Sequence, residues 1–395
     1  MRKCRLKDRF MRYSFLHSSI VALSLMIPAQ SLALQAPGER SDRIVVSPEF
    51  AKFVPAPKKD LKIDYNYWNE ILNNLVFLTG VSTRQVAPKP EPLTGSRFVA
   101  EHTSPYRLEG NKIPFSKLRA EHVLTLQEYK RDLEDLANTT EIAALPKQEQ
   151  LVYWINLHNL TVTLLIAESY PVIKPSNLLI GEGKVPLHDA KVISVNGSKL
   201  SLRDIRENIV YPNWEDPKVI YGFFLGDIGS PSMQGQSFTA ENVDRLLDQN
   251  ASEFVNSLRA FSRGGVSKIY KDVARFYFTN FDSDLRQHFQ QYMWDEVYEE
   301  FAAVKTFKVN SYEYDIADME GGHADHVIGN LTINGKPVND SRTFAITSYT
   351  NQIKGKTEIL LKQGRIKRGK VIVGYEEHTL SEGNKPNMKS SEQRP

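Results

Sequence analysis

The sequence predicts an α+β fold, in which a helix-rich main domain packs on a small β-sheet and a β-rich C-terminal appendage follows. Apolar residues recur at helical spacing through most of the chain up to about residue 304. Short apolar runs and one turn signal lie between these helical stretches. After Lys305 the residues alternate or are β-branched, with Gly and Asn between them. Helices that come first and strands that come later favour α+β over a doubly wound sheet.

The chain divides by composition into a signal peptide (1–33), a linker (34–60), a main domain (61–304), a β-rich region (305–380) and a polar tail predicted to be disordered (381–395). Basic residues precede the apolar run SSIVALSLMIPA, and Ser31-Leu32-Ala33 is an acceptable cleavage site. The run is too short to cross a bilayer core of about 30 Å. We therefore expect a periplasmic or secreted protein with no stable membrane span after cleavage.

The sole cysteine, Cys4, lies ahead of the apolar run and leaves with the signal peptide. A mature chain without a thiol excludes disulfides, cysteine metal ligands and a cysteine nucleophile. The net charge of +3 and the absence of a long basic run interleaved with aromatics argue against a nucleic-acid partner.

The main domain begins with a predicted helix over 65–79, followed by a proline-rich stretch over 86–114 that indicates a long surface excursion. Amphipathic spacing predicts a second helix over 116–137, with Ser116 as its cap. The stretch 145–171 predicts a helix buried on most sides, which starts at Pro146.

Beyond this central helix, Asn196-Gly197 predicts a hairpin turn and VIYGFFL (219–225) a buried strand. Two further helices are predicted, one after Thr239 and one over about 282–303. In the C-terminal region, strands are expected within 306–317, 330–338, 343–349 and 369–377.

A stripe of polar residues runs along the otherwise apolar central helix: Glu149, Asn156, Asn159 and Thr163 fall within one narrow arc at 100° per residue. A buried Asn without partners costs about 1–3 kcal/mol. These residues, the polar seam, therefore form either a satisfied hydrogen-bond network in the core or the wall of a functional site. His158 points to another face and is expected to be a packed or surface residue.

Two loops carry further candidates. Asp227 and Ser230 follow the predicted strand and could act as base and nucleophile, although the G-x-S-x-G elbow is missing and a turn-shaping role is favoured. His323, Asp325 and His326 could bind a divalent metal, but without H-E-x-x-H spacing a polar surface loop is the better interpretation. No phosphate-cradling or dinucleotide fingerprint is present, so no metal or cofactor is assigned.

The phrase Trp154-Ile155-Asn156-Leu157-His158-Asn159 resembles the F-W-I-N-L-Y-N signature of the bacterial family called domain of unknown function 547. The resemblance extends from about Tyr67 to Tyr292 and includes a glycine turn followed by an L-S-L-x-D-I-like segment. It also includes a stretch similar to C-A-S-x-G-C-P that ends at Pro231. This chain departs from the family at Leu225 and Ser230, where cysteines are usual, at Arg206-Glu207, where Glu-His is common, and at Lys218-Val219-Ile220, where Arg-Val-His is common.

The family implies an architecture and no established reaction, so whether the chain is an enzyme stays open. We expect a non-catalytic binding or interaction protein of the cell envelope, with an unidentified ligand or protein partner. The alternative is a hydrolase of an envelope or extracellular polymer that would use Ser230 or Asp227 with Glu149, Asn156 or Asn159. Hydrogen-bond contact between this loop and the polar seam, in an open pocket, would distinguish the two.

Overall fold

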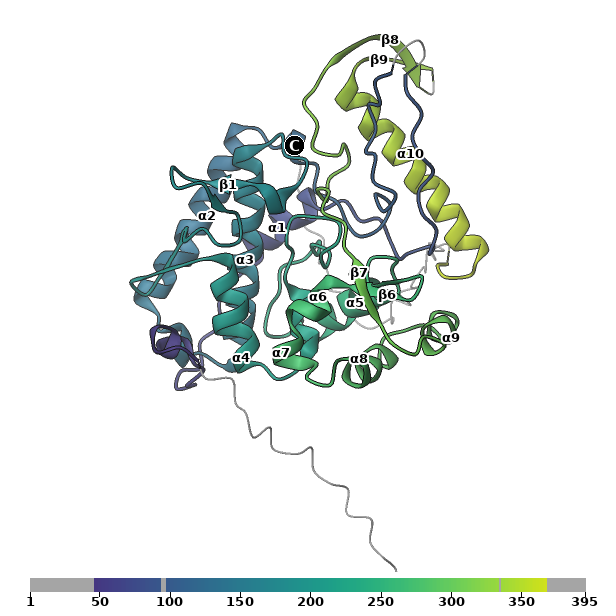
Figure 1. Cartoon of the computed structure of the whole chain (residues 1–395). Coiled ribbons are helices and arrows are strands. Elements are labelled where there is room, and N and C mark those ends of the chain that lie inside the picture. The colour runs from purple at the N-terminus through teal and green to yellow at the C-terminus, as the bar shows by residue number, and fades with distance from the viewer. Residues whose placement is uncertain (1–45, 94–96, 334, 368–395) are drawn as a thin grey trace, which may run out of the picture. The chain divides into compact units, whose positions relative to one another are not determined.

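The computed structural model describes residues 46–93, 97–333 and 335–367 (Figure 1). The chain separates into two units, Met1–Arg43 and Ile44–Pro395, and everything below concerns the second. The predicted signal peptide, the last predicted strand (369–377) and the tail lie outside the described residues. Helices dominate the described part, and its strands form small sheets, which confirms the α+β class.

The central helix is α3 (Lys147–Ser169), whose side chains are buried on every face from Glu149 to Ile166. Pro146 is its N-cap, where a missing N–H costs nothing. Helix α2 (Ala120–Thr139) packs along α3 (Figure 1). The Tyr153 hydroxyl of α3 donates to the Leu133 carbonyl of α2 at 2.9 Å. Helix α1 (Asn66–Leu75) buries Trp68, Leu72 and Leu75. The three predicted helices of this half are therefore confirmed.

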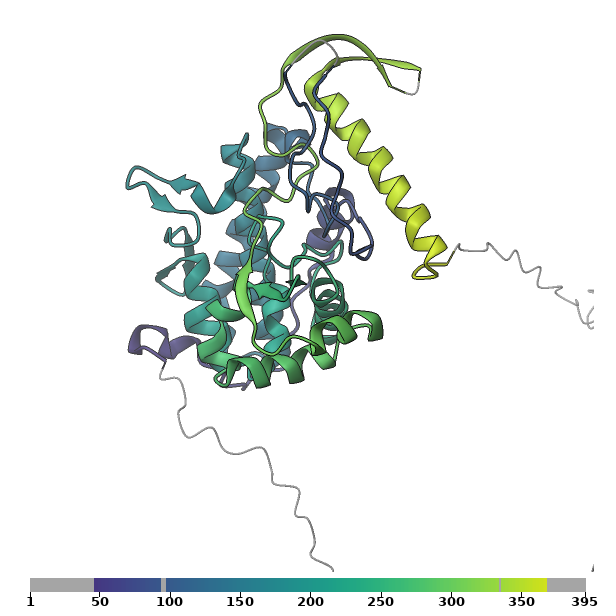
Figure 2. The same ribbon diagram turned by 45° about the vertical axis from the view of Figure 1, so that its right-hand side comes forward.

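The remaining helices are shorter. They are η1 (Pro48–Phe53), η2 (Phe115–Lys117), η3 (Ile142–Ala144), η4 (Pro175–Asn177), the π-helix η5 (Asp204–Val210), α4 (Tyr211–Asn213), η6 (Pro217–Gly222), α5 (Val243–Val255), α6 (Lys268–Asp272), α7 (Ala274–Tyr277), α8 (Phe281–Gln290) and α9 (Asp295–Ala302). Helix α10 (Ser341–Lys362) is the last described helix, and Figure 2 shows it at the side of the molecule next to the 80–112 segment.

The strands pair locally. β1 (Leu179–Ile180) and β2 (Val185–Pro186) form one antiparallel pair, and β3 (Ile193–Val195) and β4 (Ser198–Leu200) form another. β8 (Val327–Ile333) and β9 (Lys336–Asp340) form a third. β5 (Phe261–Ser262), β6 (Gly265–Ser267) and β7 (Lys308–Ser311) make a sheet in which β7 runs parallel to β6. Asn196 and Gly197 have φ of 48° and 72°, so the predicted hairpin turn between β3 and β4 is confirmed.

Two predicted strands are helices instead. The run 219–225 begins as the 3₁₀ helix η6, because Pro217 starts a helical turn and the Asp216 carboxylate accepts the Lys218 amide. The run 343–349 lies inside α10, where the Asp340 carboxylate caps the Thr343 amide. Buried residues recur there at helical intervals, namely Ser341, Ala345, Tyr349, Lys356 and Leu360. Neither run could be assigned from apolar or β-branched content alone.

Other expectations need smaller corrections. The predicted helix over 282–303 is broken between α8 and α9. The described part of the predicted linker, 46–60, is mostly exposed but is anchored to the main domain: Phe53 lies edge-to-face on Trp154, and the Ala56 amide donates to the Ala143 carbonyl. Ser116 does not cap α2, since its hydroxyl bonds the Glu320 carboxylate.

The proline-rich excursion is also more buried than its composition indicates. His102, Arg107 and Lys112 are each at most 2% exposed. The Tyr349 hydroxyl on α10 donates to the Arg107 carbonyl at 3.1 Å, and the Lys356 ammonium donates to the Leu108 carbonyl at 2.7 Å. Tertiary contact with a distant helix, which the local sequence does not contain, buries this segment.

The segment after Lys305 returns to the main domain. β7 pairs with β6, the Ile316 amide donates to the Ile173 carbonyl, and the Ala317 amide donates to the Gly226 carbonyl. The predicted boundary at 304/305 therefore does not coincide with a gap in hydrogen bonding. Among the described helices, none combines the length and the apolar character needed to span a membrane.

Candidate functional site

Asn156 joins α3 to the segment that precedes α5. Its side-chain amide donates to the Phe238 carbonyl at 2.8 Å, and its side-chain oxygen accepts the Phe238 amide at 3.2 Å. The side chain is 1% exposed. Asn156 thus satisfies both backbone groups of one loop residue, which would otherwise be buried without partners.

Asn159, one turn further along α3, also bonds one backbone carbonyl and one backbone amide, here from two residues. Its amide donates to the Gly222 carbonyl at 2.8 Å, and its oxygen accepts the Phe224 amide at 3.0 Å. Gly222 is needed at this contact, because a Cβ there would lie 2.7 Å from Cδ1 of Ile155. The backbone of 222–224 therefore lies directly on α3, held by one asparagine.

The other two members of the polar seam are also occupied. The Thr163 hydroxyl donates to the Asn159 carbonyl at 2.9 Å, and the Glu149 carboxylate accepts the Ile63 amide at 3.3 Å. Burial raises the pKa of Glu149, and the Ile63 amide opposes that rise. Each polar-seam residue bonds backbone, so the network is the structural kind that one of the two sequence interpretations expects.

The loop after Phe224 contains Asp227 and Ser230, which are 2% and 1% exposed. The Ser230 hydroxyl donates to the Asp227 carbonyl at 2.8 Å and accepts the Leu225 amide at 3.1 Å. Among the described residues, no hydrogen bond joins Ser230 or the Asp227 side chain to the polar seam. Ser230 therefore shapes a turn, with its hydroxyl proton engaged by a carbonyl rather than by a base.

The Asp227 carboxylate accepts the hydroxyl of Tyr312, which arrives from the segment after β7, at 2.7 Å. Burial raises the pKa of Asp227 to about 7, although the Tyr312 hydrogen bond acts in the opposite direction. Asp227 is thus a buried carboxyl that is about half protonated at physiological pH, and among the described side chains it bonds a tyrosine.

His158 is fully buried and forms a link that the sequence does not reveal. Its Nδ1 lies 3.1 Å from Oδ1 of Asn159, and its Nε2 lies 2.7 Å from Nη1 of Arg206 on η5. Because Asn159 Oδ1 and a guanidinium have fixed roles, Nδ1 carries the proton and Nε2 accepts. Burial and the Arg206 charge lower the pKa of His158 well below its ordinary value, which keeps the imidazole ring of His158 neutral.

The loop 323–326 forms the approach to α10. The Asp325 carboxylate accepts the Ser341 hydroxyl at 3.1 Å and the Arg342 amide at 3.1 Å, and the His326 ring packs edge-to-face on Phe98. Within the described residues, no group of three His, Cys, Asp or Glu side chains could hold a metal ion. Asp325 here organises the start of a helix, as the surface-loop interpretation expects.

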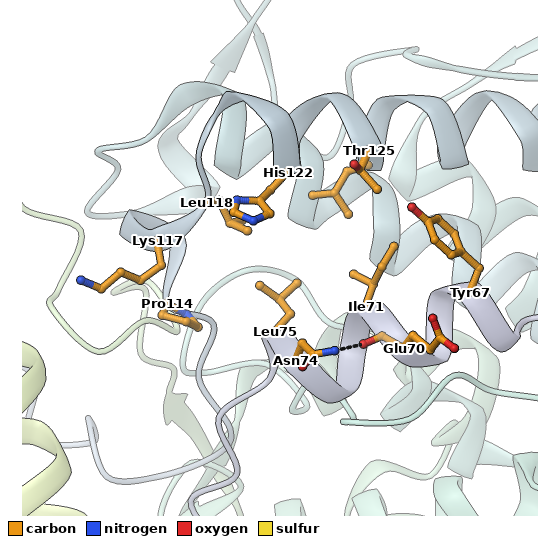
Figure 3. Close-up of a pocket in the computed structure, with 11 residues that line it drawn as sticks. Tyr67, Glu70, Ile71, Asn74, Leu75, Pro114, Lys117, Leu118, His122 and Thr125 are labelled. Atoms are coloured by element: carbon orange, nitrogen blue, oxygen red, sulfur yellow. Dashed lines mark hydrogen bonds between the residues drawn. The ribbon is translucent and has the colours of Figure 1, made fainter.

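A pocket of about 460 Å³ lies between α1 and the beginning of α2 (Figure 3). Ile71 and Leu75 face it from α1, and Leu118 and Leu126 face it from the α2 side. Volume and apolar lining are those of a small-molecule site. None of the candidate residues from the sequence lines this pocket.

Six polar side chains line the pocket, namely Tyr67, Glu70, Asn74, Lys117, His122 and Thr125. The His122 ring projects toward it, and its Nδ1 accepts the Arg119 amide at 3.0 Å, so the neutral ring carries its proton on Nε2. Glu70 and Tyr67 lie at the opposite, α1 end. The pocket therefore offers an imidazole N–H and an ammonium at one end, a carboxylate and a phenol at the other, and an amide and a hydroxyl besides, around an apolar floor.

Removal of either seam asparagine tests the structural interpretation. We expect Asn156→Ala and Asn159→Ala each to lower the free energy of unfolding by at least about 2 kcal/mol, because each strands a buried carbonyl and a buried amide. Urea unfolding measures the loss, with the exposed Asn138→Ala on α2 as the control. Unchanged stability in both seam variants would favour a functional role for the polar seam.

The raised pKa of Asp227 gives a pH-dependent prediction. A carboxyl whose folded pKa is about 7 binds its proton more tightly when folded, so its ionisation destabilises the fold as pH rises from about 4 to 7. Asp227→Asn retains an acceptor for Tyr312 and removes this ionisation. The variant should gain stability over the native chain by on the order of 4 kcal/mol between pH 4 and pH 8.

Urea unfolding across this pH range measures that difference, with the exposed Asp132→Asn as the control. A stability difference between Asp227→Asn and the native chain that is constant with pH would contradict the prediction.

Comparison with known proteins concerns the part of the chain that contains α3, η5, η6 and α5. Residues 142–255 match the family model described as "Protein of unknown function, DUF547". The match includes the polar seam, the Asn196-Gly197 hairpin and the loop with Asp227, and it is shorter than the resemblance expected over 67–292. No curated protein and no solved structure matches the chain. Residues 142–255 are thus similar to the family of domain of unknown function 547, which supports the resemblance over that part of the chain.

Proposed function

We propose that this chain is a non-catalytic binding protein whose ligand is a small, largely apolar molecule held between α1 and α2. The observation that carries the proposal is the pocket of about 460 Å³ with its apolar floor. The polar residues that could carry chemistry are committed elsewhere, to backbone groups of the fold.

The border of the pocket narrows the ligand class. Nε2–H of His122 suits a hydrogen-bond acceptor on the ligand, and the Glu70 carboxylate suits a donor at the other end. Between them Ile71, Leu75 and Leu118 favour an apolar body. The ligand that fits best is an elongated apolar molecule with an acceptor at one end and a hydroxyl or amine at the other.

The alternative, a hydrolase of an envelope polymer, has less support. It would require Ser230 to be deprotonated by a base, whereas the Ser230 hydroxyl donates to a backbone carbonyl and is 1% exposed. The raised pKa of Asp227 is the one feature that suits a catalyst, and its carboxylate is bonded to Tyr312.

The proposal includes export to the cell envelope, which rests on the basic residues, apolar run and small residues of positions 1–33. We expect the mature protein to begin near residue 34 in the periplasm or the medium. N-terminal sequencing of the fractionated protein tests this, and an intact Met1 in the cytosolic fraction would overturn the export part of the proposal.

The ligand site can be tested with the neutral fluorescent probe N-phenyl-1-naphthylamine. Thr125 borders the pocket on α2, and the adjacent Leu124 is 51% exposed and does not line it. Thr125→Trp should fill the pocket and weaken probe binding at least about tenfold, or ~1.4 kcal/mol. Leu124→Trp, one position away, should leave binding unchanged. No saturable binding by the native chain, or equal binding by both variants, would contradict the proposal.

A further inference from the structure

Arg206 is a buried cation without an anionic partner. Its side chain lies on η5 and is 6% exposed, and Nη1 bonds Nε2 of His158 at 2.7 Å and the Leu202 carbonyl at 3.3 Å. No carboxylate among the described residues lies within ion-pair distance of its guanidinium. An uncompensated buried charge costs several kcal/mol, so this cation requires an explanation.

Two other described arginines, Arg107 and Arg259, are each 2% exposed and show how this fold occupies a buried guanidinium. Arg107 has no carboxylate partner among the described residues, but its Nε, Nη1 and Nη2 donate to Gln352, Ser104 and Pro88. Arg259 pairs with the Glu253 carboxylate and also donates to the carbonyls of Ile228 and Ser230. In Arg206, by contrast, Nε and Nη2 bond no described residue, and neither atom is sealed from solvent. Nε and Nη2 are the side-on pair that binds a carboxylate or phosphate in two parallel hydrogen bonds.

The nearest acidic side chain on the same helix is already engaged. Glu207 accepts Arg203 at 3.0 Å and Arg275 at 2.9 Å. Arg203 also pairs with Asp189 at 2.5 Å. These surface pairs leave no carboxylate to neutralise Arg206.

A second unpartnered atom lies in the same region. Nδ1 of His188 is buried and has no hydrogen-bond partner in the described part of the chain. Burial is the main cause that lowers the pKa of His188, and the positive charges of Arg206 and Arg203 lower it further. His188 therefore lies close enough to Arg206 for that charge to act on it. Because the neutral ring donates its N–H to the Leu225 backbone, Nδ1 is an acceptor and suits a protonated oxygen of a ligand, while the anionic oxygens of that ligand would oppose the positive charge of Arg206.

The guanidinium is held rigidly for such a role. Nε2 of His158 accepts from Nη1, and Nδ1 of His158 is fixed by Asn159, which also bonds the Phe224 amide. His188 and Tyr312, which are both partly exposed, lie close enough to Arg206 for its charge to affect their pKa values. A preorganised fork loses little freedom when it binds.

We propose that Arg206 forms an oxyanion-binding site next to the loop 225–231, which receives a single carboxylate or phosphate group of a ligand. The site is separate from the pocket between α1 and α2, so either proposal can fail without the other. Both candidate groups share the geometry that Nε and Nη2 recognise, and direct titration separates them.

The test is calorimetric titration of the full chain with sodium phosphate, sulfate and acetate, each at a constant ionic strength maintained with sodium chloride. We expect saturable binding of at least one of these anions. Arg206→Gln should weaken that binding about tenfold to a hundredfold, because a charged hydrogen-bonded pair is lost. The matched control is Arg245→Gln on α5, whose guanidinium donates to the side chains of Gln249 and Gln236. Acetate binding without phosphate binding would identify a carboxylate site, and the reverse a phosphate site.

A measurement on the native chain protects the test against a variant that does not fold. Crystals soaked in selenate should show anomalous density within hydrogen-bond distance of Nε and Nη2 of Arg206. The proposal is overturned if none of the three anions binds the native chain, if Arg206→Gln folds and binds equally well, or if selenate occupies only other positions.

Discussion

Two asparagine side chains on a helix that is buried on all sides hold this fold together. Asn156 and Asn159 each donate to one loop carbonyl and accept one loop amide, so the segments at 222–224 and 238 lie on α3 without an intervening layer. A loop can be buried only if its backbone groups find partners. The asparagines supply these partners, and the irregular backbone from η6 to α5 can therefore enter the core.

The same arrangement explains why the polar residues of the core are poor candidates for catalysis. Asn156 and Asn159 bond backbone with both ends of the side-chain amide and are at most 3% exposed, so a substrate cannot reach them, and Ser230 is bonded and buried in the same way. Groups with unused capacity lie elsewhere. They are the border of the α1–α2 pocket and the free side of Arg206. Binding is thus better supported than bond-breaking chemistry.

Arg206 connects the hydrogen-bond network of α3 with the candidate anion site. The resemblance implies an acidic residue there and a cysteine at 225, whereas this chain has Arg206 and Leu225. The replacement puts a cation where it bonds His158, and His158 bonds Asn159. Arg206 is thereby tied to the helix that organises the core, and a ligand at this cation would contact the loop that the polar seam supports.

The sequence predicted what depends on periodicity and local turn chemistry. Helix α3, its polar stripe and the Asn196-Gly197 turn follow from spacing and residue type, and all three are present. The prediction failed where contacts with residues distant in the sequence determine the secondary structure. The run 219–225 is apolar in either a strand or a 3₁₀ helix, and 343–349 becomes helical through its Asp340 cap and its contact with Arg107.

Long-range pairing also hid the most informative residues of the candidate site. His158 and Arg206 are 48 residues apart, and Asp227 and Tyr312 are 85 apart, so no local pattern could connect them. The neighbouring positions of His158 and Asn159 were the only available signal. The pocket between α1 and α2 was similarly invisible, because its lining consists of ordinary residues on two amphipathic helices.

The central claim is that the asparagines of α3 fix the adjacent loops as firmly as the core itself. Native-state hydrogen exchange of the Phe224 and Phe238 amides tests it most directly, because each amide donates to one seam asparagine. The account predicts that both amides exchange only through global unfolding, as slowly as the amides in the middle of α3. Exchange of either amide through local opening, at rates typical of surface loops, would contradict it.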